Sequence, residues 1–118
     1  MDATSAQFAI LDAPLGDAGV AVEVRGELDI ATAPLLRQHL MALVERGPDL
    51  LVVDLTAVEF LDSVTLAVLL ATRKALGEAG RMAVVVEPGS YTRLIFDVAG
   101  VDQWLHVVAT RDEALTSR

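Results

Sequence analysis

The segment over residues 50–66 constrains the fold more than any other part of the chain. Residues 50–55 are apolar except for Asp54, which is typical of a central strand buried on both faces of a parallel sheet. A loop is expected to follow, and the apolar run after the pair Asp62-Ser63 predicts a helix. Because partners meet parallel sheets at the carboxyl ends of their strands, Ser63 is expected at a helix N-terminus on that edge.

Turn signals and apolar periodicity divide the rest of the chain into further strands and helices. A buried strand over residues 82–86 completes a β-α-β crossover, which should be right-handed with parallel strands. The sequence therefore predicts an α/β fold, a mostly parallel sheet of four or five strands with helices mainly on one face. The other expected strands lie over residues 7–11, 20–26 and 104–108, with a turn over 12–17. Helices are expected over residues 32–46, where the Thr32 hydroxyl is the cap, over 63–78, and over 91–99, where Ser90 is the cap. Residues 111–116 are expected to form either a closing helix or a frayed tail.

The length of 118 residues fits one domain over residues 1–118, with an ordered core expected at about 8–115. A hydrophobic content of 53% argues against disorder. The absence of cysteine excludes a disulfide framework and a cysteine-based zinc site.

Charge and hydropathy narrow the partners and the compartment. The apolar run over residues 64–71 is far shorter than the ~20 residues that a membrane span needs. Residues 1–4 lack the basic and then apolar pattern of a signal peptide, so we expect a cytoplasmic protein without membrane insertion. The formal net charge of −8 disfavours nucleic acid. It favours a basic protein partner, although acidity is also common in cytosolic domains.

The position of Ser63 allows two roles. A helix N-terminus carries unpaired N–H groups and about half a positive charge, so it can order an anion. A phosphate there would add about −1.5 to −2 charge units, enough to reverse an interface that accepts a neutral hydroxyl. The alternative is that Ser63 only caps the helix, a role that Asp62 can also take.

The helix expected after Ser63 carries two apolar stripes, of which only one can face the sheet. The second stripe is either an exposed docking patch beside Ser63 or is covered by the helices at 32–46 or 91–99. The first stripe contains Leu66, Leu69, Leu70 and Arg73, and the second contains Val64, Val68, Ala71 and Ala75.

The segment DLTAVEFLDS over residues 54–63, together with GELD over residues 26–29, resembles the STAS family and in particular the bacterial anti-sigma factor antagonists. The resemblance extends over nearly the whole chain and includes residues 94–101. It implies a non-enzymatic protein that binds an anti-sigma factor, itself a serine kinase, and releases the sigma factor. Phosphorylation of a serine ends this binding, and a phosphatase resets the protein.

The resemblance assigns roles to particular residues. Ser63 matches the phosphorylated serine, and Asp29 matches a position close to it. The family's small residue and glycine after the serine are replaced by Val64 and Thr65, a bulkier pair that could hinder a kinase loop and that makes Thr65 a second-choice acceptor. The expected partner-binding residues are Asp29, Asp62, Ser63, Val64 and Val68.

The sequence is also compatible with two other functions. STAS domains also serve in stress-signalling scaffolds and lipid-transport complexes, so the chain could be a binding module that is never phosphorylated. An enzyme would need a base near Ser63, but His39 and His106 are expected away from the carboxyl edge. No nucleotide-binding fingerprint is present, and no cofactor or metal is predicted. Tyr91 and Trp104 are expected to be partly buried core residues.

Overall fold

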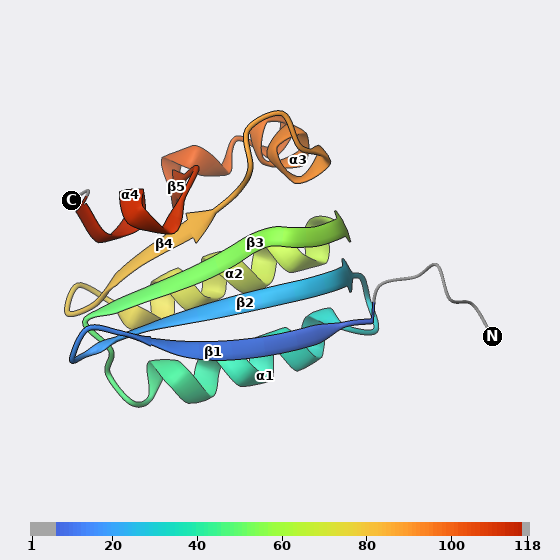
Figure 1. Ribbon diagram of the computed structural model, residues 1–118. Coiled ribbons are helices and arrows are strands. Elements are labelled where there is room, and N and C mark those ends of the chain that lie inside the picture. Colours follow the sequence, from blue (N-terminus) through green and yellow to red (C-terminus); the bar gives the residue numbers. More distant parts are fainter. Residues whose placement is uncertain (1–6, 117–118) are drawn as a thin grey trace.

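A computed structural model describes residues 7–116 (Figure 1). Residues 1–4, which lack a signal-peptide pattern, lie outside the described range. The strands are β1 (Ala9–Leu15), β2 (Gly19–Leu28), β3 (Leu50–Leu61), β4 (Arg81–Val85) and β5 (His106–Val108). The helices are α1 (Ala33–Val44), α2 (Ser63–Leu76), α3 (Tyr91–Ala99), α4 (Arg111–Thr116) and the short 3-10 helix η1 (Val101–Gln103).

The five strands form one sheet in the order β1-β2-β3-β4-β5. Only β1 runs antiparallel to its neighbour, while β2, β3, β4 and β5 are parallel. The long strand β3 is central: nine residue pairs join it to β2 and five join it to β4. The prediction of a mostly parallel sheet of four or five strands is therefore confirmed.

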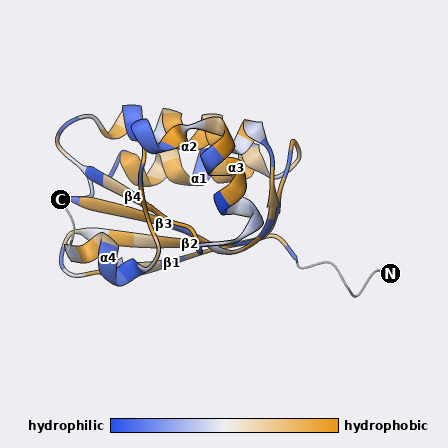
Figure 2. Cartoon of the chain, turned by 90° about the horizontal axis from the view of Figure 1, so that it is seen from above, coloured by the Kyte–Doolittle hydropathy of each residue, from blue (hydrophilic) through white to orange (hydrophobic). Residues whose placement is uncertain are grey.

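Helices cover the two faces of the sheet unequally. Helices α1 and α2 lie side by side over one face, and the short α4 lies on the other (Figure 2). The main core fills the first face, where Leu36, Leu69 and Phe96 are fully buried. A smaller apolar cluster that includes Val52 and Ala114 lies under α4. Within residues 7–116, no helix combines the length and apolar composition that crossing a bilayer requires.

Two predicted loops are wrong because neighbouring strands extend the sheet. The turn expected over residues 12–17 begins later, since Asp12 to Leu15 continue β1. Proline has no backbone N–H to donate to a neighbouring strand. Pro14 is tolerated in β1 because β1 is an edge strand with a neighbour on one side only. The loop expected after Leu55 is also strand, because β3 goes on pairing with β2 as far as Leu61.

Two aromatic residues also differ from expectation. Tyr91 is 48% exposed and Trp104 is 67% exposed, so neither is the partly buried core residue that the sequence suggested. Both therefore lie on the surface of the protein, where they are available to partners.

Asp54, in β3, connects the sheet to α4 through an ion pair with Arg111. Its Oδ2 accepts a hydrogen bond from Arg111 Nε at 2.7 Å, and its Oδ1 accepts from the N–H and the hydroxyl of Thr56 at 2.9 and 2.7 Å. Burial by itself would raise the pKa of Asp54, but these hydrogen bonds and the charge of Arg111 outweigh it and lower that pKa below its ordinary value. Asp54 is thus a buried, ionised anchor for the C-terminal helix.

We expect Asp54→Asn to lower the free energy of unfolding at pH 7 by about 1–3 kcal/mol, because charge-assisted hydrogen bonds are lost. The folded pKa lies below the unfolded value near ~3.9. The contribution is therefore fully present above that value and is lost as the pH falls through the folded pKa. Urea unfolding at pH 7 and pH 3 tests this. An equal difference between the two proteins at both pH values would contradict it, and the exposed Asp17→Asn serves as control.

Candidate functional site

The pairing of β2 with β3 places two acidic residues at one edge. Leu28 pairs with Leu61 at the carboxyl ends of these parallel strands. The next residues along the two strands are Asp29 and Asp62, and the N–H of Asp62 donates to the carbonyl oxygen of Leu28 at 3.2 Å. The structure therefore brings together two residues that lie far apart in the sequence.

Asp29 shapes the loop between β2 and α1. Its Oδ1 accepts hydrogen bonds from the N–H groups of Thr32 and Ala31 at 3.0 and 2.9 Å, and these bonds lower the pKa of Asp29. The Thr32 hydroxyl accepts from the N–H of Asp29 at 2.9 Å and donates to the carbonyl of Glu27 at 2.8 Å. The prediction that this hydroxyl caps the first turn of α1 is therefore wrong, since it is used within the preceding loop.

Asp62, not Ser63, caps α2. The Asp62 backbone is extended, and its Oδ1 accepts a hydrogen bond from the N–H of Val64 at 3.1 Å. Ser63 is the first residue of the helix and is exposed. Its hydroxyl makes no hydrogen bond to another residue among 7–116. The hydroxyl of Ser63 is thus open to chemistry from outside the chain.

Two predicted site residues are buried instead. Thr65 is 0% exposed, and its hydroxyl lies 3.5 Å from the carbonyl oxygen of Leu28. Val68 is 6% exposed and belongs to the main core, where α1 packs against α2. Thr65 as a phosphate acceptor and Val68 as a partner contact are therefore wrong for the folded chain. Of the second stripe, Val64 remains at the surface, 42% exposed.

Exposed apolar side chains gather on the elements that meet at this edge. Ile30 is 78% exposed in the loop after β2. Phe60, near the end of β3, stacks on Tyr91 at the start of α3, with ring centroids 6.0 Å apart. None of these exposed apolar residues was predicted from the sequence, although an apolar residue such as Ile30 within a loop is a usable signal. Helix α3 contributes two further exposed residues, Leu94 and Val98.

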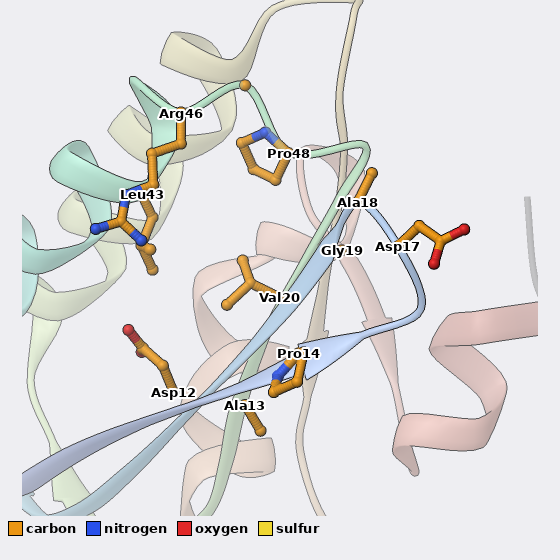
Figure 3. A pocket seen from close by; sticks show the side chains of 11 residues that line it. Asp12, Ala13, Pro14, Asp17, Ala18, Gly19, Val20, Leu43, Arg46 and Pro48 are labelled. Carbon is orange, nitrogen blue, oxygen red and sulfur yellow. The ribbon is translucent and has the colours of Figure 1, made fainter.

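The opposite end of the molecule holds a different opening. A cleft of about 510 Å³ lies between the β1–β2 hairpin and the end of α1 (Figure 3). Asp12 and Arg46 are among its lining residues, but none of the predicted site residues is. His39 contacts Asp12 through Nε2 and Oδ1 at 2.7 Å, so this histidine is engaged away from Ser63. Over residues 7–116, no three His, Asp or Glu side chains are grouped as a metal site requires.

Comparison with known proteins identifies the family. The model of the STAS domain matches residues 13–114. The anti-sigma-F factor antagonist RsfB of Mycobacterium tuberculosis is 40% identical over 99 residues, which cover 83% of this chain and 80% of RsfB. The chain therefore belongs to the STAS domain family, and its relatives are bacterial anti-sigma factor antagonists.

Solved structures agree with this family. An anti-sigma factor antagonist from Mycobacterium paratuberculosis superimposes with a TM-score of 0.82 at 37% identity, covering 98% of this chain and 96% of the other. The Bacillus cell fate determinant SpoIIAA in its phosphorylated form gives a TM-score of 0.65 at 23% identity, covering 91% of this chain and 96% of SpoIIAA. The likeness to SpoIIAA supports the fold alone.

The capping geometry makes a direct prediction about stability. We expect Asp62→Ala to lower the free energy of unfolding by about 1 kcal/mol, because the N–H of Val64 loses its acceptor. Ser63→Ala should change the free energy of unfolding by less than ~0.5 kcal/mol, because the Ser63 hydroxyl makes no hydrogen bond to another residue within 7–116. Urea unfolding of both variants provides the measurement. A larger loss for Ser63→Ala than for Asp62→Ala would show that the serine is the cap.

Proposed function

We propose that this protein is an anti-sigma factor antagonist that binds a kinase-type anti-sigma factor through the surface around Ser63. Binding releases the sigma factor, phosphorylation of Ser63 ends binding, and a phosphatase restores it. The observation that carries the proposal is the exposed hydroxyl of Ser63, which makes no hydrogen bond to another residue within 7–116 and lies at the edge shared with Asp29 and Asp62. The protein acts in the cytoplasm, by binding and not by catalysis.

The unmodified surface suits a protein partner. A neutral hydroxyl costs little to desolvate when it finds a partner. Val64 follows Ser63 in the chain, and Ile30 lies in the loop after β2; both side chains are exposed and gain free energy when a partner covers them. The two carboxylates at the edge favour a basic counterpart surface.

A phosphate on Ser63 would make the same surface unfavourable for a partner, because it adds negative charge next to two carboxylates. It would add about −1.5 to −2 charge units at the edge that already holds Asp29 and Asp62. The N–H of Val64 is occupied by the carboxylate of Asp62, so the phosphate would compete with this carboxylate at the N-terminus of α2. The added negative charge beside two carboxylates opposes a closed interface.

The relatives support this proposal. RsfB of Mycobacterium tuberculosis, which is 40% identical to this chain over 99 residues, is an anti-sigma-F factor antagonist. Val64, which stands where the family pattern has a small residue, is exposed and must be accommodated by the kinase.

The decisive experiment uses the partner anti-sigma factor with ATP. Mass spectrometry should locate the phosphate on Ser63 and none on the buried Thr65. In calorimetric titrations, Ser63→Ala should keep the affinity of the unmodified protein, while Ser63→Asp should weaken it at least ~10-fold, or about 1.4 kcal/mol. An unmodified Ser63, with equal binding by both variants, would refute the switch.

The apolar part of the surface can be tested separately. We expect Val64→Asp to weaken binding of the anti-sigma factor by about 10-fold or more, because a charge replaces apolar contact area. Leu11→Asp is the matched control, since Leu11 is 47% exposed on β1 and Val64 is 42% exposed. Equal effects of the two substitutions would mean that the partner does not contact α2.

One observation favours a second candidate. Val64 and Thr65 replace the small residue and glycine of the family pattern, which narrows the approach of a kinase to Ser63. The alternative is a STAS binding module that is never phosphorylated and serves in a stress-signalling scaffold or a lipid-transport complex. Partner binding that is insensitive to Ser63→Asp would support this alternative.

A further inference from the structure

The only lysine and the only tryptophan of the chain line one groove. It lies at the C-terminal end of α2 and has a volume of about 540 Å³. Lys74 is in the last turn of the helix, and Trp104 follows η1 with 67% of its surface exposed. Four further residues complete the lining, namely Leu70, Arg73, Gly77 and Glu78.

The groove is basic although the chain is acidic. The formal net charge of the chain is −8, yet two cations and one carboxylate, Glu78, line this groove. The guanidinium of Arg73 is held by the carbonyl oxygens of Gly77 and Gly80 at the end of α2. Lys74 is exposed and forms no ion pair with any residue in the described part of the chain. Its charge is therefore available to a ligand.

Further basic side chains lie beyond the groove. Arg73 also lines an adjoining pocket of about 220 Å³ together with Arg81 and His106. No acidic side chain lines that pocket. The region between the end of α2 and the start of β4 and β5 is therefore a basic area, in contrast to the acidic edge at Asp29 and Asp62.

The groove is separate from the surface around Ser63. Ser63 and Lys74 are eleven positions apart on α2, which corresponds to about 16 Å along a helix. Ser63 begins the helix at the carboxyl edge of the sheet, whereas the groove lies near the amino ends of β4 and β5. A partner bound at Ser63 would leave the groove open.

We propose that this groove binds an acidic segment of a second protein, one that carries an apolar side chain next to its carboxylates. Trp104 and Leu70 offer apolar surface for such a side chain, and large amphipathic rings dominate the energetics of protein interfaces. Lys74 supplies the opposite charge for the carboxylates. A nucleic acid fits less well, because its affinity depends on many cations that neutralise phosphates, whereas this groove offers two, enough for a short acidic segment. The protein would then join two partners through the two ends of α2.

Fluorescence of Trp104 reports on the groove directly, because no other tryptophan is present. The probe is a short synthetic peptide of glutamate and leucine, titrated at low salt, and a peptide of lysine and leucine is the control. We expect a saturable blue shift with the acidic peptide only, weakening as ionic strength rises. Lys74→Glu should reduce the affinity at least ~10-fold. Arg37→Glu, the same charge change on an exposed residue of α1, should not.

Several outcomes would overturn the proposal. One is an equal response to both peptides, which would indicate apolar adhesion, and another is no response at all. A third is unchanged binding by Lys74→Glu, and a fourth is a shift with vesicles of anionic lipid but not with the peptide. Ser63→Asp should leave the peptide response unchanged, so failure here is distinguishable from failure of the switch at Ser63.

Discussion

The pairing of β3 with β2 is the interaction on which the rest of the structure depends. It runs from Gly19 and Leu50 at one end to Leu28 and Leu61 at the other. Asp29 follows the end of β2 and Asp62 follows the end of β3, so both residues lie at the same edge of the sheet. The register is fixed by burial on both faces, since a slip by one residue would turn every side chain of β3 to the opposite face and would change the position of Asp62 relative to Asp29. The geometry of the candidate site is thus set within the core of the sheet.

Much of this arrangement could be predicted from the sequence. The apolar run over residues 50–55 and the helix after Ser63 were sufficient to place the serine at a helix N-terminus on the carboxyl edge. The lengths of β1 and β3 could not be predicted from the sequence. The second half of β3 mixes polar and apolar residues, and only its pairing with Gly26 to Leu28 shows that it remains strand. The role of the Thr32 hydroxyl likewise depends on where the carbonyl of Glu27 lies.

Burial on α2 separates residues that the sequence could not distinguish. Val64 and Val68 fall on one helical stripe, but Val68 is buried in the main core while Val64 stays exposed. The difference depends on how α2 packs against its neighbours in the fold, which the periodicity of α2 does not contain. The same helix carries an acidic end, where we propose the switch at Ser63, and a basic, aromatic end. Its capped first turn and the hydrogen-bonded Arg73 at its last turn hold both ends in place.

The departure from the family pattern after Ser63 has different consequences at its two positions. Thr65 faces the interior, where its side chain fills space next to Leu28 and its hydroxyl approaches that residue's carbonyl oxygen. A glycine there would give up this packing and would cost helix propensity of up to about 1 kcal/mol. The threonine is therefore explained by stability and has no surface that a kinase could meet. Only Val64 alters the surface beside the hydroxyl of Ser63. Of the two replaced positions, only the exposed side chain of Val64, in the first turn of α2, can therefore affect how closely a kinase approaches Ser63.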